Sequence, residues 1–254
     1  MNNKMRLIID PKRPGPINMG LDETILEEVV SGSELPTLRL YGWSPENVTI
    51  GYFQGMEEEV DLEACERLGV SYLRRTTGGG AVLNAQEVTY NLVAPVGFAG
   101  IPKQILDSYR YICGGVLAGL RHMGVEAEFI PLNDLVVNGK KISGNAQTRR
   151  GDYLLQHGTI LLQVDVEKMF SLLKVPAEKL KGKLIADVKQ RVTGLEILLG
   201  RAVTFDETIA GMVQGFGEHL QVEFERKPVT AVELQRAQEL ADEKYANRMW
   251  NFKR

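Results

Sequence analysis

Cysteine, histidine and tryptophan are all scarce in this sequence. Its 254 residues include 2 cysteines, Cys65 and Cys113, together with 3 histidines and 2 tryptophans. Both cysteines fall in segments with the apolar spacing of amphipathic helices, and they provide neither a disulfide framework nor the Cys-x-x-Cys spacing of a metal site. We expect two reduced and mostly buried thiols, in a fold that forms without disulfide or metal staples.

An excess of positive charge and long apolar runs are also missing. Lysine and arginine number 30 against 33 acidic residues, which gives a formal net charge of -3, whereas nucleic-acid-binding domains are usually basic. No stretch reaches the roughly 18 to 20 continuous apolar residues of a membrane-spanning helix, and residues 1–10 lack a small-residue cleavage site. The expectation is a soluble, cytoplasmic protein that binds neither nucleic acid nor a membrane.

The apolar residues that are present repeat with clear periods. Ile17, Leu21, Ile25 and Val29 recur every four residues, which predicts a helix, and a repeat of three to four residues predicts the longest helix over 105–123. Alternation predicts strands at 7–9, 38–40, 48–50, 70–75, 125–130, 134–137, 140–145 and 153–163, and a β insertion near 203 and 222. No linker or repeat divides the chain. We predict a single domain over 1–254 of the α/β (α+β) class, with mixed β-sheets flanked by helices and a small helical C-terminal part.

The first polar cluster runs from Arg74 to Gly80, where two arginines and two threonines precede three glycines at the end of a predicted strand. Consecutive glycines let backbone N–H groups approach a ligand, and guanidinium groups pair with phosphate or carboxylate. The spacing matches neither a Walker loop nor the Gly-x-Gly-x-x-Gly fingerprint, and a plain tight turn fits three glycines equally well. The cluster indicates an anion cradle but names no ligand.

The second polar cluster runs from Asn133 to Gln147 and contains Asn138-Gly139, a pair typical of a type I′ hairpin turn. A carboxylate such as that of Asp134 can hold Mg²⁺, and a lysine ammonium can neutralise a phosphate. Side chains alternate along a strand, so at most one of Lys140 and Lys141 enters a site. A solvated hairpin tip is the alternative for both lysines.

The third cluster is Gln156-His157-Gly158-Thr159, which opens the apolar strand at 160–162. A lone histidine before a strand is more often a structural hydrogen-bonding residue than an acid-base catalyst. Local spacing leaves both roles open.

Together the three clusters resemble the lipoate-protein ligase A and octanoyltransferase family. The run 74–82 matches its RRxxGGGxV motif, and Asn133-Asp134 followed by 141–147 matches its NDxxxxxxKxSGxAQ pattern. Further matches at 18–23, 157–162 and 244–252 extend the resemblance, in order, over essentially the whole chain. The resemblance implies a fold similar to the catalytic domains of biotin protein ligases and class II aminoacyl-tRNA synthetases.

The resemblance implies an ATP-dependent lipoate-protein ligase. Such ligases join lipoate to ATP with Mg²⁺, form lipoyl-adenylate, and let a carrier lysine attack the mixed anhydride. The family's KxSG lysine corresponds to Lys141, whose implied catalytic role is electrostatic stabilisation, and Asp134 is the implied metal ligand. The implied substrate- and adenylate-binding residues are Arg74, Arg75, Gly78, Gly79, Gly80, Ala81, Asn84, Asn133, Asp134, Ser143, Gly144, Ala146, His157, Gly158 and Thr159.

The resemblance also implies protein partners. The expected acceptors are apo lipoyl domains of 2-oxoacid dehydrogenases or the glycine cleavage H protein. The family's large domain ends near the position of Trp250-Asn251-Phe252, so we expect no C-terminal accessory domain in this chain. A separate accessory domain protein is a further expected partner for adenylation.

Two departures from the family pattern keep other functions open. The GGGxV motif usually continues as His-Asp, whereas here Leu83 is followed by Asn84-Ala85, which leaves room for a silent acyl- or adenylate-binding subunit. Octanoyltransferases need a cysteine nucleophile, in some branches just before the KxSG lysine, and the stretch 128–132 contains none. This absence favours the ligase over an octanoyl or lipoyl transferase that uses a carrier thioester. The arginine-glycine repeat loop of biotin ligases is missing, which disfavours that activity.

Overall fold

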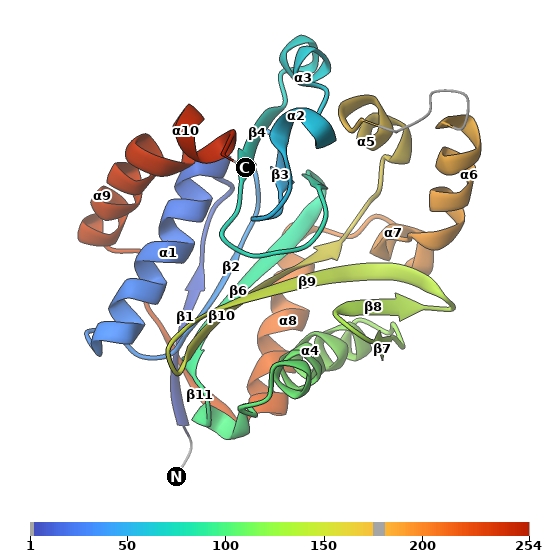
Figure 1. The fold of residues 1–254 in the computed structure, drawn as a ribbon. Coiled ribbons are helices and arrows are strands. Elements are labelled where there is room, and N and C mark those ends of the chain that lie inside the picture. The colour runs from blue at the N-terminus through green and yellow to red at the C-terminus, as the bar shows by residue number, and fades with distance from the viewer. Residues whose placement is uncertain (1–2, 175–180, 254) are drawn as a thin grey trace.

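The main structural element is a mixed sheet of eight strands. The computed structural model describes residues 3–174 and 181–253, without the side chains of 181–184 (Figure 1). In spatial order the strands are β11 (Val222–Arg226), β1 (Asn3–Ile9), β2 (Thr37–Tyr41), β6 (Glu87–Pro95), β10 (Tyr153–Leu161), β9 (Lys140–Arg150), β8 (Asp134–Val137) and β7 (Glu128–Ile130). β1 pairs in parallel with β11 and β2, while the pairs from β2 to β7 are antiparallel.

A second sheet carries the predicted anion cradle. Its strands are β4 (Ser71–Arg74), β3 (Asn47–Ile50) and β5 (Val82–Asn84), with β3 parallel to β4 and antiparallel to β5. The connection from β4 to β5 is the glycine-rich segment, and we call residues 76–81 the glycine loop. In Figure 1 this loop hangs from the small sheet in front of the large one.

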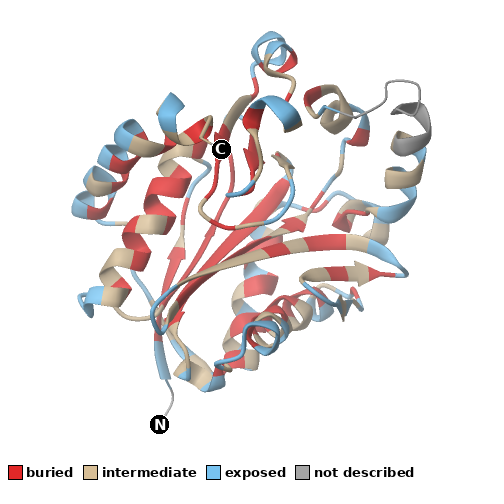
Figure 2. Ribbon diagram, in the orientation of Figure 1, coloured by how far each residue is buried: buried red, intermediate tan, exposed pale blue. Residues whose placement is uncertain are grey.

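Helices cover both faces of the large sheet. α1 (Gly15–Ser31) and α9 (Ala231–Leu240) pack together on one face, and α4 (Ile105–His122) and α8 (Phe205–Leu220) pack together on the other. Buried residues accordingly run through the central strands and along the inner sides of these helices (Figure 2). The remaining described helical segments are α2 (Met56–Glu59), α3 (Leu62–Leu68), η1 (Phe98–Gly100), α5 (Val166–Leu172), α6 (Lys181–Arg191), α7 (Leu195–Leu199), η3 (Ala241–Tyr245) and α10 (Arg248–Asn251).

The pleat of the strands divides their side chains between these two helix layers. On β2, Leu38 and Leu40 join the apolar core beneath α4 and α8, whereas the intervening Arg39 faces α1 and hydrogen-bonds to Asn18 and Asp22 of that helix. The α1 side of the sheet is therefore mixed, with this buried polar network beside an apolar cluster that includes Ile25 and Val93. The polar network lies next to the glycine loop.

The structure confirms the predicted mixed α/β class and most of the predicted elements. The helix predicted at 105–123 is α4, and Asn138 and Gly139 adopt the positive φ angles (50° and 74°) that the hairpin turn requires. The β insertion predicted near Val203 is wrong, because Val203 lies in the loop before α8 with its side chain in the core. The segment near Val222 does form a strand, β11.

Both cysteines are free and buried, as predicted, Cys65 in α3 and Cys113 in α4. No helix within residues 3–174 and 181–253 is both long and apolar enough to cross a bilayer.

Candidate active site

A cavity of about 530 Å³ opens beside the glycine loop. It lies between α1, the glycine loop, the end of β9 and the C-terminal segment. Its lining residues are Glu23, Leu26, Tyr52, Phe53, Thr76, Gly78, Gln147, Thr148, Arg149, Arg150, Leu155, Lys244 and Trp250. Gly78 brings the predicted anion cradle into the wall of this cavity.

Arg75 holds the glycine loop in its shape. Its Nη2 atom donates to the carbonyl oxygens of Gly78 (2.7 Å) and Gly80 (2.9 Å), and its Nε atom donates to Thr77 Oγ1 (3.1 Å). Burial lowers the pKa of Arg75 to about 10, so the guanidinium stays charged at neutral pH. Arg75 therefore fixes the conformation of the glycine loop by binding two of its carbonyl oxygens.

The amides of the same loop are left without partners. Within the described part of the chain, the N–H groups of Gly78, Gly79 and Gly80 donate to no protein acceptor. Space is open beside Gly78 and Gly80, where an added Cβ would meet no heavy atom within 4 Å, and Gly79 has a φ of 100°. Unpaired, closely spaced N–H groups form a site for a negatively charged oxygen.

The Arg74 side chain has a structural position next to the cavity. All three of its guanidinium nitrogens donate to backbone carbonyls, which belong to Gly51, Tyr52, Gln54, Trp250, Asn251 and Lys253. In return, Trp250 Nε1 donates to the Arg74 carbonyl at 2.8 Å. Arg74 was predicted to contact a ligand, but in this conformation its guanidinium has no free donor. Its hydrogen bonds instead join the C-terminal segment to β4.

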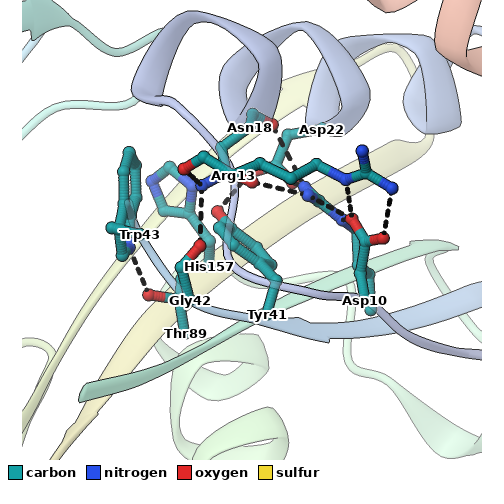
Figure 3. A network of polar contacts seen from close by, with 10 residues as sticks. Asp10, Arg13, Asn18, Asp22, Tyr41, Gly42, Trp43, Thr89 and His157 are labelled. Atoms are coloured by element: carbon teal, nitrogen blue, oxygen red, sulfur yellow. Dashed lines mark hydrogen bonds and ion pairs between the residues drawn. The ribbon is translucent and has the colours of Figure 1, made fainter. Parts of the chain in front are cut away.

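His157 lies at the edge of the polar network beneath α1 (Figure 3). Its Nε2 atom is 2.7 Å from Thr77 Oγ1 in the glycine loop, and its Nδ1 atom is 3.3 Å from Asp22 Oδ2 in α1. Asp22 also accepts from Arg39 Nη1 (2.9 Å) and the Tyr41 hydroxyl (3.0 Å). The histidine thus joins the glycine loop, the sheet and the first helix.

Lys141 forms an ion pair beside the hairpin. Its Nζ atom lies 2.7 Å from Asp134 Oδ1, with 39% and 35% of the two side chains exposed. A Cβ added at Gly144 would come within 2.8 Å of Lys141 Cε, so this glycine makes room for the lysine. Lys140, by contrast, is exposed at the hairpin tip. The two lysines therefore differ in exposure, and neither lines the cavity beside the glycine loop.

The predicted magnesium site does not fit the observed side chains. Asp134 is already paired with Lys141, and no group of three or more His, Cys, Asp or Glu residues suited to a metal occurs in the described ranges. A lysine in contact with the carboxylate opposes cation binding.

The other predicted residues of the hairpin brace β9 against its neighbours. Asn133 and Asn145 exchange side-chain to backbone hydrogen bonds, and Tyr90 donates to Asn145 Oδ1 at 2.6 Å. Gly158 must lack a Cβ, because that atom would lie 2.1 Å from Asn145 Oδ1. Ser143 is fully buried, and Ala146 and Thr159 lie in the sheet opposite His157 and Thr89.

Asn84, which stands where the family pattern usually has histidine, points into the scaffold. Its Nδ2 atom donates to Glu87 Oε1 at 2.7 Å, and its Oδ1 atom accepts from Thr49. Burial raises the pKa of Glu87 to about 7. Ala81, near this corner, is half-buried and packs against the small apolar cluster around Val48 and Ile50.

Several cavity residues were missed in the prediction from sequence. Arg149 and Arg150 follow the matched motif after Thr148, and they could have been found as a basic pair between the strands predicted at 140–145 and 153–163. Tyr52 and Phe53 could have been found as adjacent aromatics after a buried strand. Nothing in the local sequence places Lys244 or Trp250 beside them.

Comparison with known proteins decides the family. The model of the lipoyl protein ligase A/B catalytic domain matches residues 14–217. This chain belongs to that family. The family resemblance inferred from the motifs is thereby confirmed, and the chain is an enzyme of the lipoyl protein ligase A/B group.

Several similar curated proteins carry the name octanoyltransferase LipM. The chain is 39% identical to octanoyltransferase LipM of Geobacillus kaustophilus, over 95% of each chain. It is 33% identical to octanoyltransferase LipM of Bacillus subtilis, over 97% of each chain.

Solved structures in the family share the fold throughout. A bipartite lipoate protein ligase from Thermoplasma acidophilum, studied with its E2 lipoyl domain, superposes with a TM-score of 0.86 at 31% identity, over 99% of this chain and 96% of that one. A lipoate-protein ligase A bound with ATP superposes with a TM-score of 0.82 at 28% identity, over 99% of both chains.

The predicted ATP-dependent ligase activity is therefore wrong, and so are the predicted ATP, Mg²⁺ and free lipoate. The high-coverage curated relatives are octanoyltransferases, which supports the alternative that the sequence left open. A transferase takes its acyl group from a donor that is already activated, so no adenylation is needed. The missing cysteine beside Lys141 misled the prediction.

Proposed function

We propose that this chain transfers an octanoyl group from a carrier thioester to the ε-amine of a lysine in a lipoyl domain. The observation that carries the proposal is the similarity to octanoyltransferases along nearly the entire chain. The acceptors are the apo lipoyl domains of 2-oxoacid dehydrogenases or the glycine cleavage H protein. Because octanoyl transfer from a thioester needs no adenylation, it does not require a separate accessory domain.

The described side chains support direct transfer. The lysine nitrogen attacks the thioester carbonyl, a C–N bond forms, the C–S bond breaks, and the carrier thiol leaves with the proton that the amine gives up. Negative charge develops on the carbonyl oxygen during this step, and donors preorganised around such an oxygen lower the barrier. The free amides of Gly78, Gly79 and Gly80 supply such donors. We assign to Lys141 the supply of positive charge, which requires its ammonium to leave the ion pair with Asp134.

The two cysteines argue against an acyl-cysteine intermediate. Cys65 and Cys113 have no exposed surface. Burial raises the pKa of Cys65 to about 11 and that of Cys113 to about 12, whereas the reactive form of cysteine is the thiolate. We therefore assign the nucleophile to the acceptor lysine itself.

The test is an incubation of the purified chain with an octanoyl carrier thioester and an apo lipoyl domain, without ATP, followed by mass spectrometry of the acceptor. We expect a mass gain of one octanoyl group. A parallel mixture contains free octanoate, ATP and Mg²⁺ in place of the thioester. Modification in the second mixture and none in the first would overturn the proposal.

A further inference from the structure

The mouth of the cavity carries aromatic side chains in an exposed position. The Phe53 side chain is 88% exposed, and its ring centroid lies 4.9 Å from that of Tyr52, which in turn lies 5.9 Å from that of Trp250. We call Tyr52, Phe53, Arg149, Arg150, Lys244, Trp250 and Lys253 the rim. Except for Lys253, which stacks on Tyr52 and Trp250, they all line the cavity.

The residue that precedes the exposed Phe53 is held by backbone hydrogen bonds. The Tyr52 N–H donates to the Thr77 carbonyl at 2.9 Å, and the Tyr52 carbonyl accepts from Arg74 Nη1 at 2.7 Å. Tyr52, which directly precedes Phe53, is thus bound at both its amide and its carbonyl. A large apolar side chain as exposed as that of Phe53 is typical of a binding surface.

The rim is also positively charged, although the chain as a whole is acidic. Glu23, which lines the cavity beside the rim, is bound by Lys244 at 2.6 Å and lies 4.0 Å from Arg150. Arg149 donates to neutral acceptors, on Gln147, Lys103 and Ser108. The Lys253 Nζ atom sits 3.5 Å from the Trp250 ring centroid. Neither Arg149 nor Lys253 has a carboxylate partner among the described residues.

We infer that the rim is the docking surface for an acidic face of the acceptor carrier domain. The identity of this partner rests on the proposed function. A lysine side chain is short, so the body of the domain that bears it must lie against the mouth of the cavity. The unpaired cations match acidic groups on that body, and Phe53 supplies the apolar contact at the centre.

The test measures binding of an apo lipoyl domain directly, by isothermal titration calorimetry, and therefore does not depend on turnover. We expect Phe53→Ala to weaken binding about tenfold, and Lys253→Glu to weaken it about tenfold at low salt and less at high salt. Arg121→Glu is the matched control, because this exposed arginine lies on α4, away from the rim.

Unchanged affinity in both rim variants would overturn the docking surface even if octanoyl transfer is observed. So would variants that weaken binding of the octanoyl donor carrier while leaving the lipoyl domain unaffected. If the rim variants weaken binding and no octanoyl transfer occurs in any mixture, the docking surface stands and the proposed function fails.

Discussion

The two faces of the large sheet are both buried, yet they differ in chemistry. On β6, Val88 and Leu92 point to α4 and α8 and pack among aliphatic and aromatic side chains, whereas Glu87, Thr89 and Asn91 point to the opposite face. That second face holds ion pairs and hydrogen bonds that reach the glycine loop through His157. The same face also carries the apolar cluster around Ile25 and Val93. The comparison teaches that the alternation of side chains gives one sheet an apolar face and a mixed face, and that the polar network near the glycine loop lies on the mixed one.

The largest expected effect is on the apolar face. Phe216 is fully buried between the helices and Tyr90, so Phe216→Ala leaves a cavity and should lower the free energy of unfolding by about 4 kcal/mol. Denaturant unfolding measures this loss, with the 70% exposed Ile197→Ala as the control. Octanoyl transfer per folded molecule should not change. A selective loss of transfer would break the separation between the faces.

On the mixed face the expected effect depends on pH. The folded pKa of Glu87, raised to about 7 from 4.5, means that the unfolded chain releases this proton first as pH rises. The stabilising contribution of the protonated group is complete below about pH 4.5 and is lost as pH rises through 7, up to about 3 kcal/mol. Relative to Glu87→Gln, the wild type should therefore lose stability across this window. A stability difference that does not change with pH would contradict the assignment.

A smaller effect is expected at the hairpin, where neither helix layer covers the ion pair of Lys141. Lys141→Ala should lower the rate of octanoyl transfer about 100-fold with little change in thermal stability, because the pair is partly exposed. Lys140→Ala is the matched control on the neighbouring exposed lysine. Equal rates in the two variants would remove Lys141 from the site.

The smallest effect is expected at the cysteines. The double variant Cys65→Ala, Cys113→Ala should transfer octanoyl at a rate within about twofold of the wild type per folded molecule, because direct transfer uses no thiolate. Mass spectrometry of the wild-type chain during turnover supplies a second measurement. An octanoyl adduct on Cys113, together with loss of transfer in the variant, would establish an acyl-cysteine route.

Local patterns were sufficient for the elements but not for the partners of the polar residues. Apolar periodicity located α4, and Asn138-Gly139 located the hairpin. The contact between Thr77 and His157 joins residues 80 positions apart, and the Arg74 contacts join β4 to the C-terminal segment. Such long-range pairing has no local signature. The motif resemblance identified the family, whereas the choice between ligase and transferase relied on a missing cysteine and failed.

The clasp formed by Arg74 has a consequence for the order in which the protein is made. Its guanidinium binds carbonyls of Trp250, Asn251 and Lys253, and Trp250 forms part of the cavity wall. While residues 250–253 are still inside the ribosome, the Arg74 guanidinium lacks three of its six carbonyl acceptors. The cavity wall is therefore complete only after residues 250–253 have bound Arg74, and cleavage by a protease between α9 and these residues would open it again.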